Sequence, residues 1–480
     1  MPNQNLTYFP KNLSRKVIVF YLISLLSVSI LYVQYALPWW LMLFGIISVV
    51  VFFHYSALFS KEWQIFSSKG FEKKVFWTAF LIRLVYVIFI YNINYELYGT
   101  YYESNAGDIT WYVPTAEYLS DAFLSGNLSE KLLNSNLNKL DDSGYVIYLT
   151  ILYVITYKSS TIILPLVIKA LLGAITCVHI YKIAKNHFDE STARIASLFC
   201  MLQFNLIWWC GSMMKETEMI FLFVLFTCKV DTLLVSKNNK ISPWLSAVLI
   251  GLLLFGFRTI LGVISFVSLF GALLFTSSKV ISTSKKVIAG ILVGMMLLMF
   301  AGNRVIEETH ELIETASDTD YQNRNMEWRT KRGGKGNQFA KYAGAAVFAP
   351  LIFTIPFPSM VYTYQDQEML NMVNGGNYIK NVLSFFVIFA MFSLLLSGEW
   401  RKYVFLIALL IGYLVALVFS VFAQSGRFHM PVIPLEMLFA AYGFSLMNKK
   451  QLKWFNSALV LEFIFCVAWA WFKLKGRNMI

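Results

Sequence analysis

Three acidic side chains stand among aromatic ones shortly before residue 120, and this stretch is suited to acid–base chemistry. A carboxylate that aromatic rings partly remove from water has a raised pKa and can take a proton from a hydroxyl. The same composition also fits an aromatic belt at a membrane surface with ordinary solvated acids. Asp108 differs from the other acids because it follows Gly107 and precedes a helical pattern, Thr110–Phe123, which it could also merely cap. The acids are Glu103, Asp108 and Glu117, and the aromatic residues are Tyr95, Tyr98, Tyr101, Tyr102, Trp111 and Tyr112.

Three cations stand singly in short polar breaks of apolar sequence, namely Lys215, Arg258 and Arg427. A cation in lipid surroundings costs at least roughly 2–3 kcal/mol, so it usually has a partner. Few acids adjoin these three in the sequence. They therefore indicate an anionic ligand such as a phosphate, for which arginine supplies paired donors and lysine a point charge. The alternative for each cation is snorkelling to lipid headgroups.

The composition indicates the class of protein whose helices must position these residues. The chain has 480 residues, of which 58% are hydrophobic and 14% charged. Soluble proteins average about 45–50% apolar and about 25% charged residues, so an integral membrane protein is indicated. The net charge of +13 is then first a topology signal, and we expect no nucleic-acid partner. The five cysteines lie in or beside apolar runs without CxxC or His-rich neighbours, so we expect neither a disulfide framework nor a metal site.

Apolar runs of about the roughly 20 residues that cross a bilayer recur along the chain and predict an all-α, polytopic helical bundle. We expect about thirteen transmembrane helices. With the N-terminus in the cytoplasm, every short inner loop carries several lysines or arginines, as the positive-inside rule requires. The expected spans are 17–34, 38–59, 75–95, 161–183, 194–210, 216–235, 243–257, 259–276, 286–302, 378–397, 402–422, 429–447 and 454–472.

Two longer segments fall on the outer side in this topology. Residues 96–160 form an outer loop with a short apolar piece, Tyr145–Tyr157, which predicts an interfacial helix. Residues 303–377 mix acids and bases, contain glycines and end in a proline-broken apolar stretch, Ala345–Tyr364. We expect a re-entrant segment and a mobile lid there, with a permanently folded cap or a disordered loop of no consequence as the alternatives. The whole chain, 1–480, is expected to be one domain, with 1–74 as an additional N-terminal helix pair.

The order of several motifs resembles membrane glycosyltransferases of the GT-C superfamily, in particular relatives of protein O-mannosyltransferases and of the lipid A aminoarabinose transferase. The resemblance extends from Gly107 to Gly443. Its motifs are Gly107-Asp108 with Tyr112 and Ala116–Leu119, Gly144-Tyr145, the helix Leu166–His187, Gly251–Arg258, Arg427–Pro434 and Ala440–Gly443. The chain departs from the family in two respects. Its acidic loop follows a third span instead of the first, and the paired Asp-Glu of mannosyltransferases is absent.

The resemblance implies an inverting transfer of a sugar from a polyprenyl-phosphate-linked donor to a hydroxyl of a glycan, lipid or protein. Asp108 would be the catalytic base, and Arg258, Arg427 and Lys215 would face the phosphate. Tyr112, Glu117 and His429 complete the expected substrate-binding set. No resident cofactor or metal site is implied, and dependence on a divalent metal is left open. Membrane lipids are the expected surroundings, and the site would face the outer side of a bacterial inner membrane.

Two alternatives remain at this point. An O-antigen-type polysaccharide polymerase or ligase would use outer arginines on a lipid diphosphate donor. A lipid-linked sugar flippase would instead show paired polar breaks near the middle of the bilayer.

Overall fold

A computed structural model describes residues 7–103, 107–127, 140–158, 161–235, 241–275, 351–362, 368–419, 425–476 and 479–480. The regular elements within these ranges are all helices, and the only β pairing there is an isolated bridge between Ala36 and Val361. The expected all-α class is therefore confirmed. The expected span 286–302 and most of the expected lid lie outside the described residues.

The chain packs into two compact units, each assembled from separate stretches of sequence. Unit 1 comprises Met1–Phe71, His187–Asn205 and Gly302–Ile480, and unit 2 comprises Glu72–Asn186 and Leu206–Ala301. The expectation of a single domain stays a prediction.

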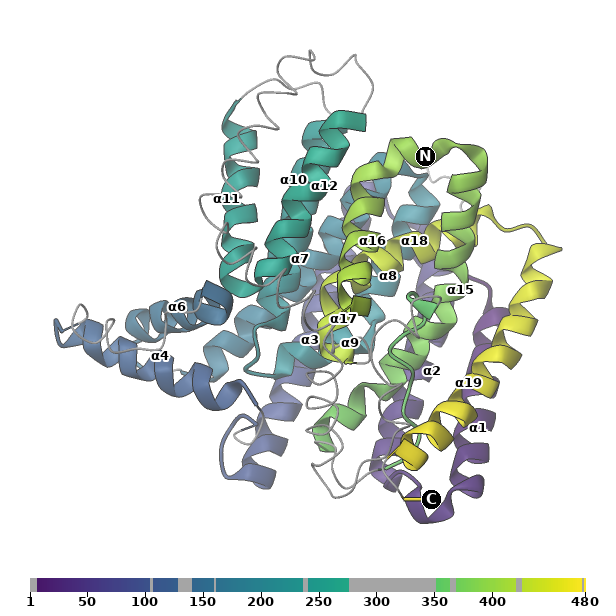
Figure 1. The fold of residues 1–480 in the computed structure, drawn as a ribbon, viewed down its shortest axis with the longest axis horizontal. Helices are drawn as coiled ribbons and strands as arrows, with labels where there is room; N and C mark the ends of the chain where they lie inside the picture. Colours follow the sequence, from purple (N-terminus) through teal and green to yellow (C-terminus); the bar gives the residue numbers. More distant parts are fainter. Residues whose placement is uncertain are drawn as a thin grey trace. The chain divides into compact units, whose positions relative to one another are not determined.

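Unit 1 is a bundle in which the C-terminal helices pack on the N-terminal ones. Helix α15 packs against α2 and α18, α18 packs against α8, and α19 packs against α1 (Figure 1). Its helices are α1 (Lys11–Leu31), α2 (Trp39–Glu62), α8 (Glu190–Leu202), α15 (Asn374–Ser397), α16 (Val404–Phe419), α17 (Gly426–His429), α18 (Ile433–Leu446) and α19 (Trp454–Gly476).

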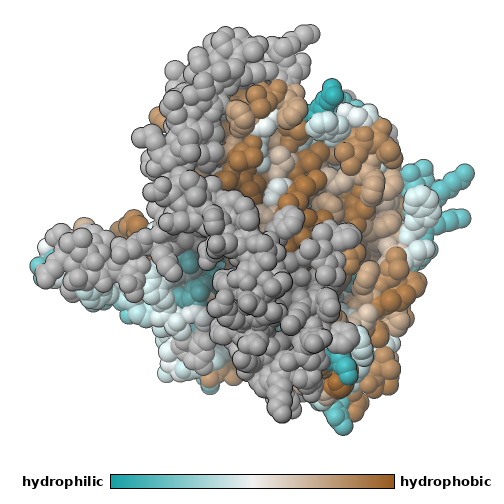
Figure 2. Space-filling view, in the orientation of Figure 1, coloured by the Kyte–Doolittle hydropathy of each residue, from teal (hydrophilic) through white to brown (hydrophobic). Residues whose placement is uncertain are grey.

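Apolar side chains cover much of the visible surface of unit 1, and hydrophilic ones gather at its loops (Figure 2). On α19, for example, Val460, Leu461 and Ile464 are about half exposed. A soluble protein rarely exposes such a continuous apolar surface, whereas a lipid-facing one must.

Unit 2 contains a pair of helices, α4 and α6, that lie side by side, and α6 also packs against α11 (Figure 1). Helix α11 in turn packs against α10 and α12. The helices of this unit are α3 (Ser68–Tyr98), α4 (Ile109–Leu124), α6 (Leu140–Ile155), α7 (Ile163–His187), α9 (Phe204–Trp208), α10 (Glu216–Val235), α11 (Ile241–Phe257) and α12 (Thr259–Phe275).

Seven helices of the described residues are long and apolar enough to cross a membrane, or eight if the broken pair α8 and α9 forms one span. The seven are α1, α2, α3, α7, α15, α16 and α19 with their short extensions. Helices also occupy the expected positions of α10, α11, α12 and α18, but α10 carries four charged residues and the other three are shorter than 18 residues. The chain is thus a multi-pass helical membrane protein, and the count of thirteen spans stays a prediction.

A helix, α6, occupies the position of the expected interfacial helix and has two unlike faces. Tyr145, Leu149 and Tyr153 are buried against its neighbours, while Ile147 and Ile151 are about half exposed. An apolar outward face suits a helix that lies against lipid.

The proline-broken stretch is irregular in its described part, 351–362, as its prolines predicted. Ile355 and Phe357 are buried, and they pack with Phe465 and Trp469 of α19. Irregular backbone in a membrane protein must satisfy its carbonyl groups inside the protein. Here the ammonium of Lys380 does so, because it donates hydrogen bonds to the carbonyl oxygens of Phe353 and Ile355.

Candidate functional site

The candidate site is built around a tight turn in unit 2, Gly211–Lys215, which joins α9 and its short extension to α10. Lys215 is the charged residue of this turn, and it is only 2% exposed. It forms a salt bridge with Asp142 at the start of α6 and donates a hydrogen bond to the carbonyl oxygen of Phe257 at the end of α11. The turn, α6 and α11 therefore meet at one ammonium group.

Asp142 occupies a backbone conformation that few side chains adopt, with φ at 73°. Aspartate tolerates this left-handed region better than most residues because its short polar side chain can bond locally. This backbone conformation directs the carboxylate of Asp142 toward Lys215.

A second buried ion pair adjoins the first. Lys169 of α7 lies 2.5 Å from Glu218 of α10 and also donates to the carbonyl oxygen of Met214 in the turn. Its ammonium lies 5.0 Å from the centre of the Tyr145 ring. Tyr145 donates its own hydroxyl to the carbonyl oxygen of Met213, over 3.0 Å. These contacts tie the turn to α7 and α6, and Lys169 and Glu218 form a structural ion pair.

Arg258 completes the cationic set, but its pairing is looser. Its Nη2 atom lies 3.9 Å from Oε1 of Glu216, too far for a hydrogen bond, and both side chains are buried. The expectation that Lys215 and Arg258 have few acids beside them is therefore wrong. Each has a carboxylate partner, and for Lys215 this partner comes from another helix that the sequence does not place nearby.

Helix α4 brings one of the expected residues, Tyr112, toward the turn through its contact with Tyr145. The carbonyl oxygen of Asp108 accepts the N–H of Tyr112, and the ring of Tyr112 packs edge-on against Tyr145 with 5.1 Å between centres. The carboxylate of Asp108 is half-buried and makes no capping hydrogen bond to α4. Glu117, further along α4, lies beside Tyr102 and Tyr153.

Glu103 is a carboxylate whose importance the sequence did not single out. It is 6% exposed, and Ser212 of the turn donates a hydrogen bond to it over 3.5 Å. Burial raises the pKa of Glu103 from 4.5 to about 7, and the hydrogen bond from Ser212 opposes this rise. A desolvated carboxylate was expected in this aromatic stretch, but the sequence argument assigned the role to Asp108. The adjacent tyrosines, Tyr101 and Tyr102, were the available signal.

Arg427 and His429 lie in unit 1, on the short helix α17. Arg427 is half-buried, with its guanidinium 5.9 Å from the centre of the Phe428 ring, and His429 is fully buried. Tyr413 of α16 holds this helix by donating to the carbonyl oxygen of Phe428. Their convergence with the unit 2 residues stays a prediction.

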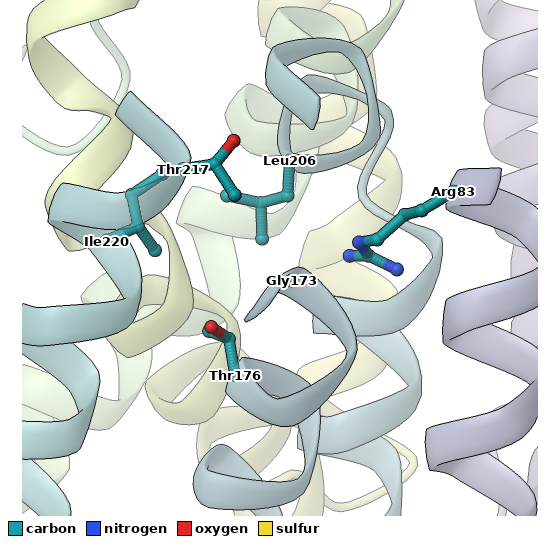
Figure 3. Close-up of a pocket in the computed structure, with 6 residues that line it drawn as sticks. All are labelled: Arg83, Gly173, Thr176, Leu206, Thr217 and Ile220. Atoms are coloured by element: carbon teal, nitrogen blue, oxygen red, sulfur yellow. The ribbon is translucent and has the colours of Figure 1, made fainter. Parts of the chain in front are cut away.

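A cavity in unit 2 lies among α3, α7, α9 and α10, and the guanidinium of Arg83 reaches into it (Figure 3). Its volume of about 10 Å³ suits a single water molecule, so it cannot hold a sugar or a phosphate. Arg83 donates to the carbonyl oxygen of Ala79 and to the sulfur of Cys177. The residues that line this cavity are Arg83, Gly173, Thr176, Leu206, Thr217 and Ile220.

The described residues give no support for a metal site or a disulfide bond. Within the described ranges, no group of three or more His, Cys, Asp or Glu side chains is placed to hold a metal ion. The five cysteines are buried free thiols.

Comparison with models of known protein families and with curated proteins gives no match for this chain.

Proposed function

We propose that this protein is a membrane glycosyltransferase of GT-C type. It transfers a sugar from a polyprenyl-phosphate-linked donor to a hydroxyl of a glycan, lipid or protein, with inversion at the anomeric carbon. The observation that carries the proposal is the convergence on one turn of unit 2 of two cations, Lys215 and Arg258, with the aromatic residue Tyr112 of the acidic helix α4. The site is expected to face the outer side of a bacterial inner membrane.

The proposed reaction is a single displacement. Asp108 takes the proton of the acceptor hydroxyl as its oxygen attacks the anomeric carbon. The bond from that carbon to the phosphate oxygen breaks, and the polyprenyl phosphate leaves with the electron pair. Its phosphate gains one negative charge, which Lys215 and Arg258 of unit 2 stabilise. The phosphate-facing role of Arg427 in unit 1 stays a prediction.

The carboxylate partners of the cations have a positioning role in this scheme. Asp142 and Glu216 keep two buried cations in place before the donor binds, so no large rearrangement is needed when the charge develops. The loose Arg258 pair is the easier of the two for a phosphate to enter. Tyr112 and Glu117 are proposed to bind the hydroxyl groups of the sugars, and the substrate-binding role of His429 in unit 1 stays a prediction.

The test is the release of polyprenyl phosphate by the full chain reconstituted in lipid nanodiscs, because this product forms whatever the acceptor is. Asp108→Asn keeps the shape of the side chain and removes its basicity, so release should fall by about 10²-fold or more. Asp121→Asn is the matched control, since Asp121 lies on the same helix, pairs with Lys158 and has a 60% exposed side chain. An Asp108→Asn variant as active as the Asp121→Asn variant would remove Asp108 from the reaction.

The donor range separates the alternatives. A panel of polyprenyl-phosphate sugars should yield free polyprenyl phosphate, whereas a polymerase or ligase of the O-antigen type would act only on diphosphate-linked oligosaccharides. A flippase would move the donor across liposomes without cleaving it. Parallel assays with EDTA and with added Mg²⁺ or Mn²⁺ measure metal dependence.

A further inference from the structure

A second buried ionic cluster lies in unit 1, separate from the candidate site. Lys380 of α15, Glu436 of α18 and Glu462 of α19 are 1%, 2% and 6% exposed. The ammonium of Lys380 lies 3.3 Å from Oε1 of Glu436 and also binds the carbonyl oxygens of Phe353 and Ile355. Lys380 and Glu436 thus form an ion pair inside the helical bundle.

Glu462 has no such cation. Among the described residues no lysine, arginine or histidine lies within ion-pair distance of it, and its neighbours are the thiol of Cys466, 3.7 Å away, and the amide of Asn381. It stands near the middle of the span Gln451–Gly476. The apolar side chains of Val460 and Leu461 beside it are about half exposed on the surface of the helix. Glu462 is therefore a carboxyl group at membrane depth with no cation of the described chain within ion-pair distance, and the ammonium of Lys380, which also acts on it electrostatically, is paired with Glu436.

The charge balance of the cluster requires one more positive charge. Two ionised carboxylates and one ammonium leave a net charge of −1 in an apolar interior. An unpaired carboxylate there is so costly that the group takes up a proton instead. Since Glu436 has the ammonium of Lys380, the proton belongs on Glu462.

The polar atoms around Glu462 also suit a group that can donate. Within the described part of the chain, five atoms on residues of the cluster have no hydrogen-bond partner: the hydroxyl of Tyr378, Nδ2 and Oδ1 of Asn381, and both carboxylate oxygens of Glu436. Asn381 and Tyr378 can donate to a carboxylate or bond to a carboxylic acid, but Glu436 offers only acceptors, and an ionised Glu462 could not bond to it because it has no hydrogen to donate. A carboxylic acid has the required O–H group.

We propose that Glu462 is a proton-binding site within the membrane, and that it is the group in unit 1 that reacts with a lipid-soluble carbodiimide. The charged and titratable groups that face it are Lys380 and Tyr378 on α15, Glu436 on α18, Cys466 on α19 and, behind Tyr378, Tyr21 on α1. This site is independent of the glycosyl transfer proposed above.

The chemistry of the reagent makes the proposal testable. Dicyclohexylcarbodiimide adds a carboxylic acid across one C=N bond: the carboxyl oxygen bonds to the central carbon, and the acid proton goes to the nitrogen. The acyl group then migrates to nitrogen and gives a stable N-acylurea, with the mass of one added carbodiimide. The carboxyl group itself supplies the proton, so the protonated form is the one that reacts.

The labelling experiment uses the full chain in lipid vesicles, with peptide mass spectrometry after exposure to dicyclohexylcarbodiimide between pH 6 and 9. Glu462 should be labelled at neutral pH, and less as the pH rises, while Glu436 stays unlabelled because Lys380 keeps it ionised. In Lys380→Met, labelling should extend to Glu436. Absence of label on Glu462 at neutral pH would overturn the proposal. Protection of Glu462 by Na⁺ or K⁺ at constant pH would also overturn it, in favour of a metal-cation site.

A pair of matched variants tests the same idea without the reagent. Glutamine resembles a protonated glutamate, so Glu462→Gln should unfold at the same temperature as the wild type. Glu436→Gln should unfold at a lower temperature, because it leaves the buried ammonium of Lys380 without its carboxylate. Equal losses in both variants would show that Glu462 is ionised, contrary to the proposal.

Discussion

Helices α6 and α11 cross closely at two glycines, Gly144 and Gly256. This crossing holds Asp142, at the start of α6, near Arg258, which follows α11. A methyl group added at Gly144 would lie 2.8 Å from the carbonyl oxygen of Gly256 and 2.9 Å from its carbonyl carbon. Carbon atoms in contact are normally about 3.5–4.0 Å apart, so the helices would have to separate by roughly 0.5–1 Å. These atoms are backbone, and no rotamer change can relieve the clash.

The expected magnitude for Gly144→Ala follows from two opposing effects. Overpacking of this kind costs about 1–3 kcal/mol, and alanine returns up to about 1 kcal/mol through its higher helix propensity. We expect a net destabilisation of about 1–2 kcal/mol. Because Asp142 lies two residues before the crossing and Arg258 two residues after Gly256, the separation should also lower the release of polyprenyl phosphate.

Two further glycines provide matched controls, read by the apparent unfolding temperature in nanodiscs. A methyl group at Gly256 would lie 3.2 Å from Cα of Gly144, so Gly256→Ala should have a smaller effect. A methyl group at Gly271 of α12 meets nothing within 4 Å, so Gly271→Ala should be neutral or slightly stabilising. If Gly144→Ala is as stable as Gly271→Ala, the close crossing of α6 and α11 is not a determinant of the fold.

Three other outcomes are expected. The pKa of Glu103 is about 7 when folded and 4.5 as its ordinary value, so its stabilising contribution is complete below pH 4.5 and lost as pH rises through 7. Titrated unfolding should thus show roughly 3 kcal/mol of pH dependence that Glu103→Gln lacks. Gly173→Ala should cost about 1–3 kcal/mol, seen in denaturant unfolding, because the new methyl would lie 2.6 Å from Nε of Arg83. Arg258→Lys should raise the KM for the donor by about tenfold through loss of its planar fork, whereas the exposed Arg401→Lys should leave the KM unchanged.

Helix positions could be predicted from the sequence because an apolar run that spans a bilayer must satisfy its backbone hydrogen bonds internally, and a helix does so. Helix α2 accordingly begins and ends within three residues of its expected limits, whereas α1 and α3 begin six and seven residues earlier than expected. The division into two units could not be predicted in this way, because it depends on which helices pack together. Apolar faces of similar composition carry little information about their partners.

The cations of the candidate site could be predicted from the sequence, but their carboxylate partners could not. Lys215 and Arg258 could be found because a charge in an apolar stretch is rare. The partner Asp142 comes from a distant part of the sequence, and only the crossing of α6 and α11 brings it near. The burial of Glu103 is likewise a property of the packed turn, since its sequence neighbours are also those of Asp108.

The division of unit 1 into separate stretches of sequence has a consequence for the biosynthesis of the protein. Helices α1 and α2 are made first, but their partners α19 and α15 are made last. About 300 residues separate α2 from α15, so at about 5–20 residues per second α2 waits for α15 for roughly 15–60 s after it leaves the ribosome. All the stretches of unit 2 are synthesised within this interval. The order of synthesis therefore favours a nascent chain in which unit 2 assembles first and unit 1 closes only when the last helices enter the membrane.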